Sequence, residues 1–477
     1  MVFSSIEFLW LFMPVALGLY LVVPPRLRNL LLALLSLVFY VWGAHAVLFL
    51  FLGSISFNFV AGRVLGRLRE RGDEAGVRRV MWLAVMANLL VLFTWKYAAF
   101  GARQLDAVLG FSGLGGVGIP AIALPIGISF FTFHGISYIV DVARGTSKPM
   151  RSLVDYTQYM AFFPQLIAGP IVRYHQIDDQ ILHPPPRSER MQDLADGFPR
   201  FALGLCKKVL IADQVAAISA AAFDSGGAPS GQTAWLGALA YTVQIYFDFS
   251  GYSDMAIGMA RMFGFRFPEN FARPYSSVSL TDFWRRWHMT LSFWFRDYVY
   301  IPLGGSRGST GQTVRNLMLV FAFTGIWHGA AWTFALWGLY HGLLLVGERL
   351  TGIRTLPDTR LAIPRRAGTL LAVIVGWVMF RASSPAQAMD FYRAMFSLDT
   401  SPLTDQITAA ATSKALLALG IGIASFLLPR DLVMGKVLQG RWDGAPLAAR
   451  FAVVALLPFA AIAVAAGSFS PFLYFRF

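Results

Sequence analysis

The sequence predicts an all-α integral membrane protein, a polytopic bundle of about 11 or 12 transmembrane helices with re-entrant or short helices among them. Hydrophobic residues make up 56% of the 477 residues and charged residues only 14%, whereas ordinary globular chains carry about 25% charged residues. Apolar runs recur along the whole chain. No segment shows the alternation typical of transmembrane strands, so the backbone must satisfy its hydrogen bonds within helices.

The expected spans follow one another with short polar connections. The first, residues 6–23, has neither a preceding basic segment nor a cleavage site, so we expect it to be retained. Several runs are shorter than the about 20 residues of a full crossing. One of them contains Pro164, Gly169 and Pro170 and is predicted to be re-entrant. After the first, the runs are residues 30–42, 47–60, 80–95, 119–142, 156–172, 198–223, 234–259, 314–332, 334–346, 367–380, 409–428 and 451–466.

Arginines concentrate in residues 63–79, in a chain with a formal net charge of +14. Short basic loops stay in the cytoplasm, so this segment is expected to be a cytoplasmic basic loop. Counting back three spans places the N-terminus outside, and an even number of crossings returns the C-terminal span and aromatic tail, residues 451–477, to the outside. The basic residues lie between apolar runs, so no nucleic-acid partner is expected.

Residues 264–311 are too charged to span a bilayer, yet they are rich in Trp, Phe and Tyr. Irregular backbone near a membrane persists only against protein or a water-filled cavity, so this segment is expected to line a functional cavity. Helical spacing would place Trp284 and His288 on one face and turn Arg285 partly away. With Asp282, these residues form either a wall for a polar or anionic ligand or an interfacial amphipathic helix with an aromatic belt.

His328 is the leading catalytic candidate among the seven histidines. It follows Trp327 in an apolar run, and ionisable side chains within a membrane are functional candidates by default. A neutral buried imidazole can act as a general base. Gly325 and Gly329 would let another helix or a narrow substrate approach closely. The alternative is a histidine that makes an interhelical hydrogen bond beside a packing glycine pair. On the next span, His341 is expected to line the same cavity.

Polar side chains interrupt the hydrophobic run of residues 234–259. Asp248 and Tyr252 are four positions apart, as are Ser250 and Asp254, so each pair faces one direction on a helix. A carboxylate at membrane depth must be paired, protonated or hydrated. Either these side chains join helices as buried polar contacts, or one of the two aspartates orients a histidine ring.

Several other chemistries are excluded by their missing motifs. No Walker A loop, dinucleotide fingerprint, zinc-protease motif or nucleophile elbow occurs in a credible context. The single cysteine, Cys206, excludes an internal disulfide and a cysteine-cluster metal site, and neither a metal nor a bound cofactor is expected. An intramembrane histidine without a serine nucleophile fits acyl transfer, in which a base takes a proton from an acceptor hydroxyl that attacks a thioester. The remaining polar candidates are expected to be structural, solvated or interfacial: His134, His175, His183, Lys207 and Lys208.

Five segments resemble the membrane-bound O-acyltransferase (MBOAT) family, in particular its branch of alginate O-acetyltransferase membrane subunits. The resemblance covers nearly the whole chain. It implies a ring of membrane helices around a central tunnel that leads from a cytosolic donor to the far side. It also implies that His328 is the catalytic histidine and His288 the second signature histidine. The matching segments are residues 124–131, 163–170, 246–254, 282–292 and 325–329.

The resemblance implies a membrane O-acyltransferase of the bacterial inner membrane. Such an enzyme would move an acetyl group from a cytosolic donor, acetyl-CoA, across the membrane for O-acetylation of an exported polysaccharide such as alginate. Its implied partner is a periplasmic or membrane-anchored acetyltransferase of the SGNH type. The alternative is a non-catalytic transporter or channel component of a polysaccharide export complex, because broken helices and buried polar residues also suit transport.

The aromatic tail has two interpretations. Phe472, Tyr474 and Phe477 follow the spacing F-x-Y-x-x-F, and aromatic side chains commonly form a belt at the membrane surface. The spacing also resembles the C-terminal motif of a small companion peptide in teichoic-acid D-alanylation. That resemblance implies that Tyr474 is an acyl acceptor at the outer mouth of the tunnel.

Overall fold

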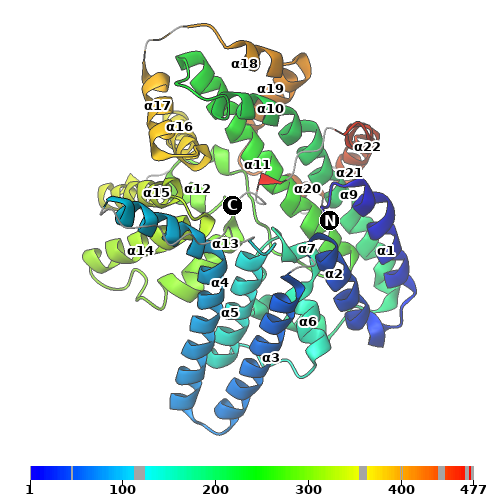
Figure 1. The fold of residues 1–477 in the computed structure, drawn as a ribbon. Helices are drawn as coiled ribbons and strands as arrows, with labels where there is room; N and C mark the ends of the chain where they lie inside the picture. Colours follow the sequence, from blue (N-terminus) through cyan, green and yellow to red (C-terminus); the bar gives the residue numbers. More distant parts are fainter. Residues whose placement is uncertain are drawn as a thin grey trace. The chain divides into compact units, whose positions relative to one another are not determined.

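A computed structural model describes residues 2–44, 47–111, 124–353, 362–397, 399, 401–438, 446–467 and 472–473. In these ranges all regular secondary structure is helical (Figure 1), which confirms the all-α class. The chain forms two compact units. Unit 1 comprises Glu7–Leu194 and Ala260–Pro268, and unit 2 comprises Val2–Ile6, Ala195–Met259 and the described part of Glu269–Phe477.

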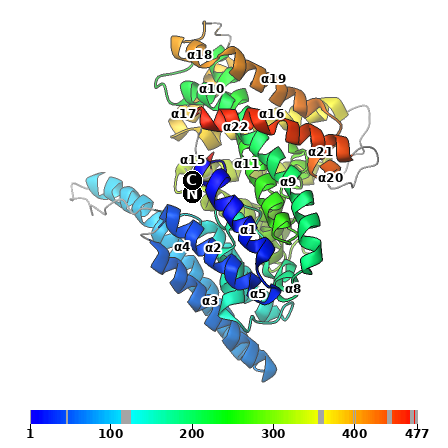
Figure 2. The same ribbon diagram turned by 90° about the vertical axis from the view of Figure 1, so that its right-hand side faces the viewer.

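Unit 1 is built around a long helical hairpin of α3 (Leu48–Glu70) and α4 (Glu74–Phe111), against which α5 (Ile128–Arg144) packs (Figures 1 and 2). At 1.5 Å per residue, α4 is about 57 Å long, whereas the bilayer hydrocarbon is about 30 Å thick. The other α-helices lying wholly in unit 1 are α1 (Met13–Val22), α2 (Arg28–Ala44), α6 (Leu153–Ala161), α7 (Phe163–Leu166) and α8 (Asp178–Leu182).

The basic segment 63–79 is mostly helical rather than a loop. Helix α3 continues through Glu70, and only a short turn separates it from α4. Gly72 adopts a left-handed conformation with φ of 70° in that turn. The carboxylate of Asp73 then accepts the backbone N–H of Gly76 at 2.8 Å, which satisfies a free donor in the first turn of α4.

Unit 2 contains the helices that position the candidate site. Its buried core is rich in aromatic side chains, among them Trp284, Trp287, Trp337 and Trp377. The π-helical turn η6 (Lys207–Ala212) links α9 to α10. The α-helices lying wholly or largely in this unit are α9 (Arg190–Cys206), α10 (Asp213–Phe223), α11 (Gly231–Met262), α12 (Leu280–Trp284), α13 (Met289–Phe295), α14 (Thr310–His328), α15 (Trp332–Thr351), α16 (Ala362–Arg381), α17 (Pro385–Phe396), α18 (Asp405–Ala410), α19 (Ser413–Leu427), α20 (Met434–Leu438), α21 (Pro446–Ala455) and α22 (Leu457–Ala465).

Five helical segments in the described ranges are long and apolar enough to cross a bilayer, so the chain is a multi-pass membrane protein. Two shorter apolar helices cover Phe8–Val22 and Ser413–Leu427. The total of about 11 or 12 crossings stays a prediction. The five segments are Pro25–Ala44, Leu48–Glu70, Glu74–Gly110, Ala362–Arg381 and Leu447–Ala465.

Several expected spans are interrupted. Residues 156–172 divide into α6 and the single turn α7, and residues 198–223 contain the π-helical turn η6. Residues 314–332 do not form one helix, because α14 ends at His328. In the run 119–142, α5 begins at Ile128, and residues 119–123 lie outside the described residues.

Candidate active site

Two of the predicted histidines, His288 and His328, are buried in unit 2 and contact the same tryptophan. The ring centroid of Trp327 lies 4.9 Å from that of His328 and 6.2 Å from that of His288. The exposed fractions of His328 and His288 are 6% and 1%. The structure therefore brings the three side chains into one cluster, although His288 is distant in sequence from the other two.

His328 is the last residue of α14, rather than a residue inside a continuous membrane helix. The helix ends because Gly329 adopts an extended conformation. A Cβ at Gly329 would collide with the ring of Phe334, so this break requires glycine. The C-terminus of a helix carries partial negative charge. The position of His328 therefore favours the positive charge that its ring acquires when it accepts a proton.

Aromatic rings enclose both His328 and His341. The centroid of Trp337 lies 5.1 Å from His328 and 5.0 Å from His341. Phe380 covers His328 at 5.1 Å, and Trp284 meets His341 at 5.1 Å with the two rings perpendicular. Electrostatic interactions are stronger in such an apolar environment than in water. His341 thus shares the aromatic surroundings of His328.

Close helix contacts create this enclosure. A Cβ on Gly325 would lie 3.2 Å from the Cα of Gly338, and a Cβ on Gly338 would lie 3.1 Å from the Cα of Gly325. Gly325 therefore packs against Gly338 of α15, which is the close helix approach expected at this glycine. On α16, a Cβ at Gly376 would lie 2.7 Å from Nε2 of His341. Neither ring nitrogen of His341 has a hydrogen-bond partner among the described residues, and such buried atoms usually bind water or a ligand.

Asn270 fixes the tautomer of His288. Its Oδ1 accepts the backbone N–H of Thr290 at 3.3 Å and the Thr290 hydroxyl at 2.9 Å. This atom is therefore an acceptor oxygen, and Nδ1 of His288, 3.1 Å away, must donate to it. The lone pair of the neutral ring is then on Nε2. Burial lowers the pKa of His288 to about 3, so the ring is neutral at physiological pH.

The backbone at His288 is left-handed, with φ of 43° and ψ of 53°. Helix α12 ends at Trp284, so Trp284 and His288 do not share a helix face as expected. The N–H of Met289 donates to the carbonyl of Asn270 at 2.9 Å, which holds the turn. A non-glycine residue in this conformation stores about 1–2 kcal/mol, and such residues cluster at functional sites.

Asp282 is held by two arginines. Its Oδ1 accepts Nε of Arg286 at 2.9 Å, and its Oδ2 accepts a guanidinium nitrogen of Arg430 at 2.7 Å. These contacts favour a structural role for Asp282 over the positioning of a ligand. Arg285 is exposed, which agrees with its expected orientation away from the core.

The polar residues of α11 are bound by lysines. Nζ of Lys208 lies 2.7 Å from Asp248, and Nζ of Lys207 lies 2.7 Å from Asp254 and 3.5 Å from the Ser250 hydroxyl. Lys208 is only 1% exposed. The expected interfacial position of these lysines is therefore wrong for Lys208. Asp248 and Asp254 are therefore paired with lysines. The ring of His288 is oriented by Asn270 and not by either aspartate.

Tyr252 contacts the C-terminal segment. The ring of Phe472 packs perpendicular to that of Tyr252 at 4.5 Å, and the N–H of Leu473 donates to Asp248 at 2.9 Å. Phe472 is 1% and Leu473 6% exposed. These two residues are therefore anchored beside α11. The acceptor candidate Tyr474 lies outside the described residues.

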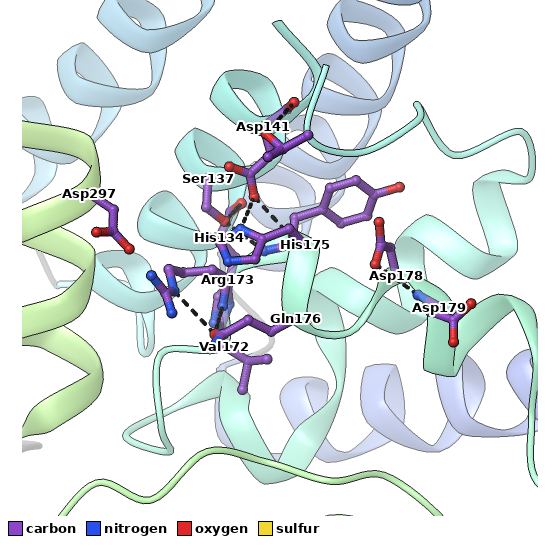
Figure 3. A network of polar contacts seen from close by, with 12 residues as sticks. His134, Ser137, Asp141, Val172, Arg173, His175, Gln176, Asp178, Asp179 and Asp297 are labelled. Atoms are coloured by element: carbon purple, nitrogen blue, oxygen red, sulfur yellow. Dashed lines mark hydrogen bonds and ion pairs between the residues drawn. The ribbon is translucent and has the colours of Figure 1, made fainter. Parts of the chain in front are cut away.

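Unit 1 contains a separate polar network (Figure 3). His175 is not simply solvated, because its Nδ1 lies 2.9 Å from Asp141, which also accepts the His175 backbone N–H at 3.1 Å. The hydroxyl of Ser137 donates to the carbonyl of His134 at 2.9 Å and meets the Tyr159 hydroxyl at 3.0 Å. These bonds tie the chain around His175 to α5, which indicates a structural role. Among the described residues, no group of His, Cys, Asp and Glu side chains is placed to hold a metal ion.

Sequence reasoning missed Asn270 and the partners of the lysines. No helical period relates Asn270 to His288, so only the fold brings the amide to the ring. Lys207 and Lys208 were recognisable as charges in an apolar run. Lys208 also pairs with the nearby Asp213 at 2.7 Å. Asp248 and Asp254, however, are on another helix, and the linear pattern does not reveal their pairing with the lysines.

Comparison with known proteins gives a consistent result. A profile of the membrane-bound O-acyltransferase family matches residues 140–386, a range that includes His288, His328 and His341. A probable alginate O-acetylase AlgI of Azotobacter vinelandii is 44% identical over the full length of both chains. A peptidoglycan O-acetyltransferase of Helicobacter pylori is 34% identical over 84% of this chain and 80% of its own. A teichoic acid D-alanyltransferase of Bacillus subtilis is 32% identical over 46% of this chain and 58% of its own.

Proposed function

This chain belongs to the membrane-bound O-acyltransferase family and is a membrane enzyme that transfers acyl groups to hydroxyl oxygens, and we propose that its acyl group is acetyl. The donor is a cytosolic thioester, acetyl-CoA. The acetyl group crosses the bacterial inner membrane and is used to O-acetylate an exported polysaccharide, alginate or a similar one. The names of the alginate and peptidoglycan relatives support this substrate class.

The observation that carries the proposal is the enclosed pair of histidines. His328 and His288 contact one tryptophan, and both lie in the segment that matches the family profile. His328 takes the proton of the acceptor hydroxyl, whose oxygen bonds to the thioester carbonyl carbon. The carbon–sulfur bond breaks, and the proton passes from the imidazolium to the leaving thiolate. The products are an acetyl ester and a free thiol.

His288 serves this step as a hydrogen-bond acceptor. Because Asn270 engages Nδ1, the unprotonated nitrogen of the neutral ring is Nε2, which accepts and does not donate. A neutral ring in this tautomer cannot donate to the thioester carbonyl oxygen, so His288 does not polarise that group. The geometry instead suits an acyl acceptor whose hydroxyl group directs its proton toward His288 and His328.

An acceptor-dependent thiol assay tests the proposal directly. Purified protein in liposomes is given acetyl-CoA with and without a hydroxyl acceptor, and free CoA is measured. We expect CoA release to require the acceptor and to yield an equal amount of acetyl ester. A cell in which the protein supports polysaccharide export, while the pure protein forms no ester with any acceptor or SGNH-type partner, would favour the transporter alternative.

The Asn270→Asp variant is expected to make activity sensitive to acid. A carboxylate beside Nδ1 stabilises the imidazolium and raises the pKa of His288. The neutral ring is then lost as the pH falls through the raised pKa, so the acid limb of kcat/KM moves to higher pH. Thr290→Val is the control, because it removes a neighbouring donor without adding charge. A uniform loss of rate at every pH in Asn270→Asp would show that Asn270 only supports the fold.

The turn after α3 is expected to face the cytoplasm. An Arg71→Cys variant should resist a membrane-impermeant thiol reagent added from the periplasm, because basic segments remain on the cytoplasmic side. Glu7→Cys, near the N-terminus, should react from the periplasm and serves as the control. Labelling of position 71 and protection of position 7 would show that the orientation of the chain in the membrane is the reverse of the one proposed.

The C-terminal segment supports a role for Tyr474 as acyl acceptor. Its neighbours Phe472 and Leu473 are anchored at Tyr252 and Asp248 of α11. A phenol, with an ordinary pKa of about 10, becomes a good nucleophile when a base such as His328 removes its proton. The resulting aryl ester would pass the acetyl group to an SGNH-type partner.

A further inference from the structure

Unit 2 contains a cavity of about 430 Å³ whose wall includes none of the histidines. The wall is formed by parts of α9, η6, α11, α19 and α20, together with Leu456 and with residues 271, 273, 275, 276, 428, 432 and 433. Its volume lies within the range of about 300–1,000 Å³ that is usual for small-molecule sites. The cavity is therefore large enough for a ligand that the proposed acyl transfer does not use.

The cavity has an apolar, exposed side. Ile421, Leu428 and Leu456 line the cavity and are 51%, 46% and 45% exposed. The neighbouring segment Leu447–Ala465 is apolar and long enough to cross a bilayer, and Leu417 on α19 is 65% exposed. In a membrane protein, exposed aliphatic surface of this kind faces lipid. The cavity thus opens where hydrocarbon chains are available.

The other side of the cavity is charged. Arg200 pairs with Asp254 at 2.6 Å and with Glu269 at 2.7 Å, and Lys207 pairs with Asp254 at 2.7 Å. The third lining cation is Arg273.

Arg273 makes no ion pair among the described residues. Its guanidinium donates to the carbonyl oxygens of Ser425 at 2.5 Å, Leu428 at 3.0 Å and Leu432 at 3.4 Å. Three cations therefore face two carboxylates, and one positive charge is left in excess. Arg273 is also held in a left-handed conformation, with φ of 54°, as His288 is. A net positive charge beside an apolar cavity matches a ligand with an anionic head and a hydrocarbon tail.

We propose that this cavity binds one anionic phospholipid, with its phosphate at Arg273 and Lys207 and an acyl chain along the apolar wall. A thioester arm of CoA would fit less well, because its amides need hydrogen-bond partners when buried. The serine hydroxyls in the wall are already used: Ser276 donates to the Arg273 carbonyl at 2.8 Å, and Ser425 to the Gly422 carbonyl at 2.6 Å. A hydrocarbon chain makes no such demand.

Lipid retention by the purified protein tests the proposal. The full-length chain is placed in nanodiscs of phosphatidylcholine with a small fraction of phosphatidylglycerol carrying the same chains, re-extracted in mild detergent, and analysed by native mass spectrometry. We expect one retained phosphatidylglycerol per protein. Ile421→Trp, which fills the cavity, should lose it. Leu417→Trp, on the same helix but outside the lining, should keep it.

Charge variants test the proposed contact between the lipid phosphate and Arg273. Each basic side chain near a membrane surface contributes about 1 kcal/mol to the binding of anionic lipid, so Arg273→Gln should reduce the preference for phosphatidylglycerol about fivefold. Arg273→Lys should restore most of it, and Arg393→Gln, an exposed arginine elsewhere, should have no effect. Because Arg273 also caps α19, a uniform size-exclusion profile is required of each variant.

Three results would overturn the proposal. Equal retention of phosphatidylglycerol by Ile421→Trp and Leu417→Trp would show that the lipid does not bind in the cavity. An unchanged preference for phosphatidylglycerol in a well-folded Arg273→Gln variant would show that Arg273 does not recognise the anionic headgroup. Displacement of the retained lipid by acetyl-CoA would assign the cavity to the acyl donor.

Cys206, the single cysteine, lines the cavity, so its reaction with a small lipophilic maleimide should slow when phosphatidylglycerol is bound. All these readouts are independent of acyl transfer.

Discussion

Replacing His328 with alanine is expected to reduce acyl transfer by about 10²–10⁴-fold, which is the usual cost of losing a general base. His328 ends α14 inside a box formed by Trp327, Trp337 and Phe380, and it is the proposed base. The measurement is transfer of radiolabelled acetyl from acetyl-CoA to the acceptor in membrane vesicles, at matched protein level.

Two further variants distinguish chemistry from folding. His328→Gln keeps much of the side-chain volume, so it should insert and purify as the wild type does and still lack activity. His183→Ala removes an exposed histidine in unit 1, whose side chain is 75% exposed, and should remain active. Near-normal acetyl transfer by well-expressed His328→Ala would exclude His328 from the mechanism.

The Tyr474→Phe variant is expected to lower polysaccharide acetylation to the background level. Phenylalanine preserves the ring and its anchoring at a membrane surface, so the substitution isolates the hydroxyl group that would receive the acetyl. Acetylation is measured on polysaccharide from cells that produce the variant at the wild-type level. A second measurement is the retention of radiolabelled acetyl on the protein itself, which should also disappear.

Tyr97→Phe on α4 provides the matched control, because it removes a tyrosine hydroxyl in unit 1 without touching the proposed acceptor. It should leave acetylation unchanged. If Tyr474→Phe were fully active, the tail would be an aromatic anchor, and the proposed acetyl relay through the phenol would be wrong.

The fold class was predictable because composition and long apolar runs leave helices as the only way to satisfy the backbone in lipid. The ends of several helices were not predictable in the same way. An apolar window continues through His328 and Gly329. The helix nevertheless stops there, where Gly329 is extended and packs closely against Phe334. Hydropathy averages over such a break.

The candidate site was predictable in its histidines and less so in their supports. His288, His328 and His341 stand out as rare ionisable groups in apolar surroundings, and the structure gathers them around Trp327 and Trp337. The roles of their neighbours depend on distant segments. The pairing of Asp282 with Arg430, and of Asp248 with Lys208, joins residues that no local period relates.

The left-handed backbone at His288 makes histidine less favourable for stability than glycine or asparagine would be, although the proposed chemistry uses the histidine. Glycine would adopt the same φ without a steric penalty, and asparagine tolerates it better than most residues. The residue that the chemistry uses is therefore not the one that the local backbone prefers. Any thermostabilisation of this enzyme by directed evolution has to hold position 288 fixed, because selection for heat resistance alone would reward the loss of the histidine.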